Sequence, residues 1–214
     1  LVMILLYFGG ILMAILAALL MKGSLFRGEP VPFVMELPNY RFPSAKSVVL
    51  LMWEKAKDFL TRAFTVIFMA TVIIWFMQTF DTRLNVVENS ASSILAALGR
   101  LVSPIFAPLG FGDWRMVTAL VSGFTAKEAV VSTFGVILGV STEQLGIALH
   151  SLFTTASAAS FLAFCLLYTP CVAAVSTIKT ELKSGWKTVG IVFAQCLVAW
   201  LAAFMVYHVG LLLT

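Results

Sequence analysis

An apolar stretch interrupted by a proline constrains the fold of this chain more than any other part of its sequence. Residues 154–176 read TTASAASFLAFCLLYTPCVAAVS, with Pro170 near the end and Cys171 directly after it. Proline lacks a backbone N–H and its ring clashes with the carbonyl one turn earlier, so we expect an α-helix to kink or stop here. In lipid, the carbonyls freed by such a break need new partners, which only neighbouring protein or a wet cavity provides.

Two interpretations of this break remain open from the stretch alone. A thiol beside freed carbonyls is a suitable site for a soft or borderline transition metal, which makes Cys171 a candidate ligand. The alternative is a packing helix that is kinked by Pro170 and carries Cys171 as a small apolar residue, because proline is common in membrane helices. The hydroxyl groups along the stretch, Ser157 among them, either line a path or bond the carbonyls of their own helix.

The composition indicates that the chain is surrounded by lipid. Its 214 residues are 61% hydrophobic and 11% charged, and the mean hydropathy is +1.02. Soluble domains carry about 25% charged residues, so the sequence predicts an integral membrane protein. We interpret the net charge of +4 as the loop bias that orients membrane proteins, not as a nucleic-acid-binding surface. Three cysteines without a CxxC motif, together with two histidines, predict neither a disulfide framework nor a zinc site.

Apolar runs and charged loops alternate along the chain. Residues 1–21, 63–80 and 190–213 are the simplest candidates for membrane spans. The basic loop 22–62 is expected in the cytoplasm, and its segment 44–59 is either an amphipathic helix in the membrane interface or a cytoplasmic extension of the next span. Because the chain begins inside an apolar run without an initiator methionine, we expect it to be a piece of a longer protein.

Two further helix ends are predicted in the second half of the chain. A short helix over residues 90–101 is expected to be stopped by Pro104. The charged turn at residues 179–187 is expected to hold Gly185 as the terminator of the helix before it. We therefore divide the chain at residue 62: residues 1–62 hold the first span, the cytoplasmic loop and the amphipathic helix, and residues 63–214 hold the remaining membrane helices.

Two adjacent charges stand in the middle of the apolar segment 115–140. In the lipid interior Lys127 and Glu128 would each cost about 2.5–3.5 kcal/mol, so we expect them to face protein or water. Small and hydroxyl residues around them, including Ser122 and Thr125, permit close packing or a helix that breaks and re-enters. The pair either neutralises itself at a buried interface or takes part in a transport path. If the segment re-enters without crossing, the lysines of the later charged turn are cytoplasmic, and we favour this topology.

Four sequence motifs carry a resemblance to a known family. They are PFVMELPNYRFP at residues 32–43, GDWR at 112–115, GFTAKEAVVSTFG at 123–135 and LLYTPCVA at 166–173. In order and spacing they resemble the membrane domain of the ferrous iron transport protein B (FeoB) family. The resemblance covers nearly the whole chain and places it in the C-terminal part of that domain, including its second Gate (nucleoside-recognition-like) repeat.

The resemblance implies an all-α, polytopic transmembrane helix bundle with broken or re-entrant Gate helices. It implies a role in moving Fe²⁺ across the bacterial cytoplasmic membrane. The implied partners are the lipid bilayer, Fe²⁺, and the GTPase domain and first Gate repeat of the same transporter, with a homo-oligomer left open. No phosphate-binding loop motif occurs in this sequence, so GTP would act only through the absent domain, and we expect no permanently bound cofactor.

The resemblance also suggests roles for individual residues. Cys171 occupies the position of the family's Gate cysteine and Glu128 lies in its AKE motif, which makes both candidate ligands of Fe²⁺, a borderline ion that accepts thiolate, carboxylate and carbonyl groups. Residues expected to support the path or its gate are Lys127, Pro170, Ser122, Thr125 and Ser157.

Two other functions remain alternatives. Gate repeats resemble nucleoside carriers, so the chain could transport a nucleoside or another small solute. It could also be a structural half whose missing partner holds the pathway. An enzyme is not expected, because the sequence contains no apparent nucleophile–base pair or cofactor-binding loop.

Overall fold

The computed structural model describes residues 2–24, 42, 44–87, 89–169 and 171–213. Within these ranges the regular secondary structure is helical, and β-type pairing is limited to an isolated bridge between Phe80 and Val86. The all-α prediction is therefore confirmed. Contacts group the chain into two compact units, residues 1–60 and 61–214. The basic loop and the PFVMELPNYRFP motif lie outside the described residues, apart from Phe42.

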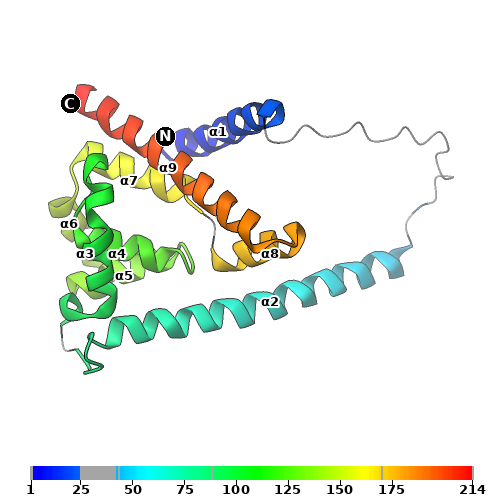
Figure 1. Ribbon diagram of the computed structural model, residues 1–214, viewed down its shortest axis with the longest axis horizontal. Helices are drawn as coiled ribbons and strands as arrows, with labels where there is room; N and C mark the ends of the chain where they lie inside the picture. The colour runs from blue at the N-terminus through cyan, green and yellow to red at the C-terminus, as the bar shows by residue number, and fades with distance from the viewer. Residues whose placement is uncertain (1, 25–41, 43, 88, 170, 214) are drawn as a thin grey trace. The chain divides into compact units, whose positions relative to one another are not determined.

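The first unit holds α1 (Val2–Ser24) and the beginning of α2 (Ala45–Thr79). The Ser44 hydroxyl caps α2 by accepting the N–H of Ser47 over 3.3 Å. From there α2 continues unbroken (Figure 1), so segment 44–59 and the span that follows form one helix, as the second of the two alternatives requires. Its 35 residues extend for roughly 52 Å, which exceeds the hydrocarbon thickness of a bilayer of about 30 Å. α2 is therefore longer than a helix needs to be to cross the hydrocarbon once.

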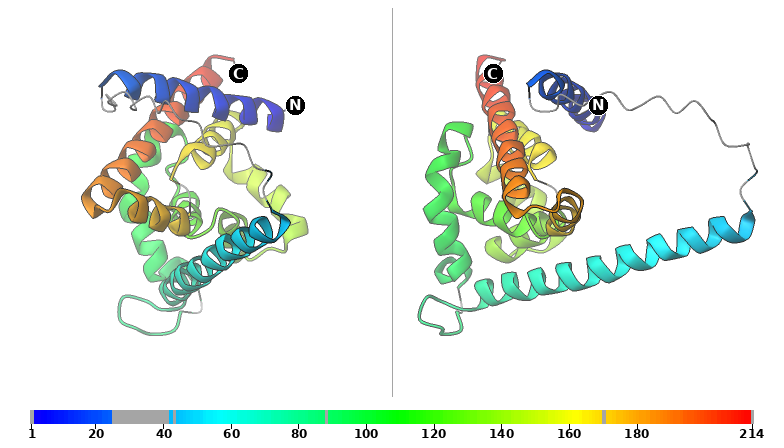
Figure 2. Two further views of the ribbon diagram at one scale, coloured as in Figure 1. Left: turned by 90° about the vertical axis from the view of Figure 1, so that its right-hand side faces the viewer. Right: turned by 45° about the vertical axis from the view of Figure 1, so that its right-hand side comes forward.

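The second unit contains most of the buried residues. Its helices are η1 (Ser90–Ser92), α3 (Ile94–Phe106), η2 (Ala107–Leu109), α4 (Trp114–Gly123), α5 (Ala129–Leu138), α6 (Thr142–Leu152), α7 (Thr155–Leu167), α8 (Val172–Leu182) and α9 (Gly185–Leu213). α4 packs between α3 and α5, and α7 packs along α9 (Figures 1 and 2). The core between them is rich in aromatic rings, with Phe111, Phe161 and Phe164 buried and in mutual contact.

The contact between α7 and α9 depends on small residues. Ala199 and Ala203 of α9 are fully buried, and the Ser160 hydroxyl of α7 donates to the Ala203 carbonyl over 2.8 Å. Further along, Gly210 lies directly against Ala156, where a Cβ would approach to 3.1 Å. Without bulky side chains at these points the two backbones approach closely, as membrane helices commonly do.

Two predicted helix ends are wrong. Pro104 does not stop the helix, because α3 begins at Ile94, after its cap Ser93, and continues through Pro104 to Phe106. A proline in the last turn interrupts a single backbone hydrogen bond, which the packed helix tolerates. Gly185 does not terminate α8 but begins α9. α8 instead ends at Leu182, and its C-cap Lys183 adopts the left-handed conformation with φ of 49°.

The described helices account for several membrane segments. Thr155–Leu182 and Gly185–Leu212 are long and apolar enough to cross a bilayer. Two further pairs, Ile94–Leu109 with Trp114–Gly123 and Ala129–Leu138 with Glu143–Leu152, bend by 104° and 80° and form either broken spans or re-entrant loops. These bent pairs fit the predicted bundle with broken or re-entrant helices.

Candidate functional site

Both polar features singled out in the sequence mark breaks between helices. The first break is the connection between α4 and α5, which holds Lys127 and Glu128. The second break is the connection between α7 and α8, which ends at Cys171. Pro170 lies outside the described residues, but α7 ends at Leu167, which agrees with the break expected near that proline. Backbone groups freed at such breaks must find partners within the protein.

The two breaks contact each other. The N–H of Val172, at the start of α8, donates to the carbonyl of Phe124, just after α4, over 3.2 Å. The ammonium of Lys127 donates to the carbonyls of Cys165 and Leu166 at the end of α7, over 2.9 and 3.2 Å. Each break thus supplies polar partners to the other.

A glycine allows this close approach. A Cβ on Gly123 would overlap the side chain of Val130 and come within 2.7 Å of the Tyr168 hydroxyl oxygen. A larger residue at this position would push against the Val130 side chain in the first turn of α5 or against the Tyr168 side chain at the start of the second break. Gly123, which is the last residue of α4, therefore sets how closely the two breaks pack.

Lys127 is paired with carbonyls and not with its neighbour. Its ammonium also lies within 3.5 Å of the Tyr168 carbonyl and 4.9 Å above the centre of the Tyr168 ring. Glu128 is exposed, and its carboxylate is not among the partners of the Lys127 ammonium, whereas Arg115 pairs with Asp113 over 3.4 Å. Mutual neutralisation of Lys127 and Glu128, one of the two alternatives, is thus not what the structure contains.

The thiol of Cys171 is not used in building the fold. Cys171 is half-buried at the N-terminus of α8, where its carbonyl accepts the N–H groups of Ala174 and Val175 at 2.9 and 3.2 Å. Its side chain makes no capping hydrogen bond. Cys196, by contrast, contacts the Thr169 hydroxyl at 3.1 Å. Cys171 is thus the cysteine that stands at a helix break, and its thiol does not cap α8.

The described side chains do not assemble a closed metal site. No group of three His, Cys, Asp or Glu residues comes together in the described ranges. The two candidate ligands, Cys171 and Glu128, therefore do not form such a cluster with a third residue. An ion at Cys171 would take its remaining ligands from backbone carbonyls, water or other parts of the transporter.

Three other predicted site residues have different positions. Ser157 lies in a capping box with Thr154, so its hydroxyl stabilises the start of α7. Thr125 is buried and donates to the Ser122 carbonyl over 2.8 Å, which tightens the turn after α4. The Ser122 hydroxyl is buried and, among the described atoms, has no hydrogen-bond partner. Of these residues, Ser122 and Thr125 lie at the first break. Ser157 lies at the start of α7, away from the second break, which follows the other end of that helix.

Two residues of the site were missed in the sequence. Tyr168 carries both the ring under Lys127 and a buried hydroxyl that has no partner among the described atoms. Thr169 is fully buried and donates to the Val192 carbonyl over 3.3 Å, which fixes the second break to α9. Both stand directly before Pro170 in the LLYTPCVA motif, so their position next to the expected break was the available signal.

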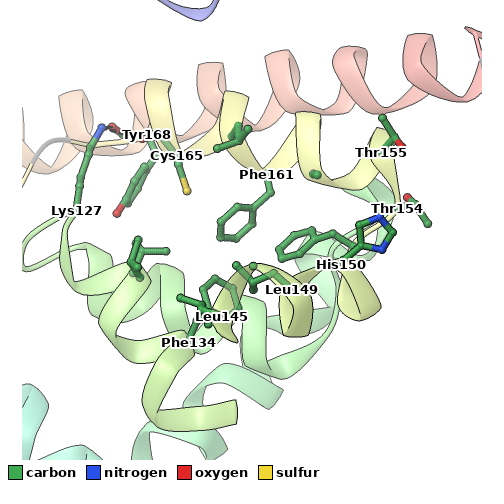
Figure 3. A pocket seen from close by; sticks show the side chains of 16 residues that line it. Lys127, Phe134, Leu145, Leu149, His150, Thr154, Thr155, Phe161, Cys165 and Tyr168 are labelled. Atoms are coloured by element: carbon green, nitrogen blue, oxygen red, sulfur yellow. Dashed lines mark hydrogen bonds between the residues drawn. The ribbon is translucent and has the colours of Figure 1, made fainter. Parts of the chain in front are cut away.

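A cavity of about 600 Å³ opens beside the breaks between α5, α6 and α7. Figure 3 shows Lys127, Cys165 and Tyr168 at one end and His150, Thr154 and Thr155 at the other. The walls between these ends are mostly apolar and include Phe134, Leu145, Leu149 and Phe161. The cavity is thus an apolar chamber that meets the polar site at Lys127.

Comparison with known proteins gives two family matches. Residues 60–185 match the Gate family, described as nucleoside recognition, and residues 3–55 match the ferrous iron transport protein B C terminus. The chain is similar to the Fe(2+) transporter FeoB of Staphylococcus aureus, with 38% identity over 98% of this chain. It is also similar to FeoB of Methanocaldococcus jannaschii, with 32% identity over 95% of this chain.

A third relative is the Fe(2+) transport protein A/Fe(2+) transporter FeoB fusion protein of Porphyromonas gingivalis, 34% identical over 97% of this chain. The chain spans 30–32% of the length of these three relatives. No solved structure matches the chain. The two family matches follow each other along the chain, and each relative aligns with nearly all of it. The chain therefore belongs to the ferrous iron transport protein B (FeoB) family, of which it carries a Gate region and the matched C-terminal segment.

Proposed function

We propose that this chain forms part of the path by which a transporter moves Fe²⁺ across the bacterial cytoplasmic membrane. The observation that carries the proposal is the meeting of two helix breaks, one of which ends at Cys171, whose thiol makes no capping hydrogen bond. Broken helices supply ion-coordinating carbonyls near the middle of many transporters. The names of the relatives, Fe(2+) transporter, agree with this chemistry.

In this proposal the ion contacts a single soft ligand. Fe²⁺ accepts thiolate together with oxygen ligands, and a transport site must bind weakly enough to release its ion. Cys171 supplies the thiol, and the exposed carboxylate of Glu128 attracts the ion toward the breaks. Ser122, Thr125 and Lys127 hold the first break, and the segment around Pro170 provides the second.

The chain would act together with parts of the transporter that precede it. We assign residues 1–62 to the first span and the cytoplasmic region, and residues 63–214 to the second Gate repeat and the final span. The GTPase domain and the first Gate repeat would belong to the remaining two thirds of the protein and complete the path. GTP would act there and Fe²⁺ would pass as substrate, with no resident cofactor in this chain.

The decisive experiment replaces the thiol in the intact transporter. Cys171→Ser keeps the size and a hydroxyl but removes the soft donor, so expression should persist while iron uptake falls about tenfold or more. Cys165→Ser is the matched control, because Cys165 lies within α7 and faces the cavity. Uptake by Cys171→Ser equal to that of Cys165→Ser would end the thiol-ligand proposal and leave the break as a packing feature.

A second candidate function is the transport of a nucleoside or another small organic solute. The observation in its favour is the apolar cavity of about 600 Å³, which falls within the size range of small-molecule sites. Parallel uptake assays with radiolabelled iron and radiolabelled nucleoside separate the two. Nucleoside uptake without iron uptake would favour this second function, and neither uptake in an intact, folded transporter would favour a purely structural role.

A further inference from the structure

The ammonium of Lys127 occupies a position that suits a free cation. Its Nζ contacts the carbonyl oxygens of Cys165, Leu166 and Tyr168 at 2.9, 3.2 and 3.5 Å, and it lies above the Tyr168 ring. The last carbonyls of a helix have no N–H partner within that helix, and the helix dipole makes this end negative. Carbonyl oxygens and an aromatic face are both groups that coordinate cations.

This arrangement is specific to the two breaks. Lys127 belongs to the first break, whereas the carbonyls belong to the end of α7, about 40 residues later in the chain. Glu128, the carboxylate next in sequence, is exposed and is not the partner of the ammonium. Cys171 follows these carbonyls in the chain, at the end of the connection between α7 and α8, as the N-cap of α8. The lysine therefore binds carbonyls at the end of α7 and in the connection that also carries the candidate thiol ligand.

We propose that Lys127 is a tethered cation that fills this carbonyl cluster between transport events and competes with the divalent ion that passes Cys171. This inference rests on the proposed function. Carbonyls freed at the end of a membrane helix need partners within the protein, and a cation supplies one when the transported ion is absent. A divalent ion and the ammonium repel each other, and the arriving ion displaces the lysine from the carbonyls. The returning lysine then favours release of the ion.

Removal of the ammonium should therefore change binding and turnover in opposite ways. In the intact transporter, Lys127→Met leaves the carbonyl cluster open to the ion. If the ammonium occupies the cluster about nine-tenths of the time, its loss lowers the apparent KM for Fe²⁺ about tenfold. The maximal rate falls as well, because no internal cation assists release. A lysine that merely held the two breaks together would give a lower rate with a KM that is unchanged or raised.

Two matched variants control this comparison. Lys127→Arg retains a cation and should keep a KM near that of the parent. Lys179→Met removes an exposed lysine of α8 and should leave both kinetic constants unchanged. If Lys127→Met does not accumulate in the membrane, Lys127→Leu replaces it, because an apolar leucine likewise leaves the carbonyls open to the ion. A KM in the neutral variant that equals or exceeds that of the parent overturns the proposal, as does an equally lowered KM in Lys127→Arg.

A second readout separates this inference from the thiol-ligand proposal. The purified intact transporter carrying Lys127→Met should gain thermal stability as K⁺ is added, because K⁺ can take the place of the ammonium. The parent should show no such gain. The same titration in a Cys171→Ser background tests the carbonyl cluster without the thiol. Normal iron uptake by Cys171→Ser alone would refute the ligand role of Cys171. The tethered cation would be refuted if K⁺ did not raise the thermal stability of Lys127→Met in either background.

Discussion

Gly123 offers the sharpest test of how the two breaks pack. Replacing it by alanine adds one methyl group at the end of α4, where the new Cβ would overlap the side chain of Val130 and approach the Tyr168 hydroxyl oxygen to 2.7 Å. Neither neighbour moves easily, because Val130 is buried in α5 and the Tyr168 ring lies under Lys127. The substitution should therefore force the breaks apart.

Two opposing terms decide the size of this effect. An extra methyl group in a packed site costs about 1–3 kcal/mol, whereas alanine in place of glycine within a helix gains at most about 1 kcal/mol. The gain is smaller for Gly123 because it is the last residue of its helix. We therefore expect a net loss of about 1–2 kcal/mol in the free energy of unfolding.

Gly190→Ala provides the control. Gly190 lies within α9, and a Cβ there meets nothing within 4 Å. This variant should retain or slightly exceed the stability of the parent. Unfolding of the intact transporter in detergent would be followed by circular dichroism for both variants. A Gly123→Ala protein that unfolds with or after the parent would refute the close packing of the breaks at this glycine.

Two further predictions concern charge and topology. Glu128→Gln should change the free energy of unfolding by less than about 0.5 kcal/mol, because Lys127 is paired with carbonyls and not with Glu128. The same variant should lower iron uptake. Thermal unfolding and uptake measured on the same protein check both effects, and normal uptake would remove Glu128 from the proposed ligands. A single cysteine introduced at position 183 should react with a membrane-impermeant thiol reagent from the cytoplasmic side, because lysine-rich turns are usually cytoplasmic. Reaction from the outer face alone would contradict the re-entrant topology.

The break near residue 170 could be predicted from the sequence because proline cannot continue a hydrogen-bonded helix. At residues 127 and 128 the sequence indicated charges that are costly in lipid, and it left open whether the segment packs closely or breaks and re-enters. The hydrogen-bond partners of Lys127 could not be predicted from the local sequence. Lys127 bonds carbonyls that lie 38 to 41 residues away, and a backbone carbonyl has the same identity in every residue. The sequence therefore offered Glu128 as a possible partner but gave no sign of the carbonyls that the fold provides.

The wrong helix ends show the same limit. Pro104 and Gly185 were given their usual local meaning, but tertiary packing continues α3 past the proline, and α9 begins at the glycine. Conversely, Lys183 adopts the left-handed conformation that a glycine two residues later was expected to provide. Such local signals are worth about 1 kcal/mol for glycine and up to about 3 kcal/mol for proline, so helix packing can override them.

The α7–α9 contact has a consequence for a protein whose surroundings change in salt and metal content. In the described part of this contact, buried alanines and the Ser160 hydroxyl bond to Ala203 hold the helices together, and none of these groups carries a charge. Dispersion and neutral hydrogen bonds are not screened by dissolved ions. The contact between α7 and α9 should therefore not weaken as ionic strength rises. Changes in metal concentration should likewise leave these two helices packed together, and with them the position of the second break.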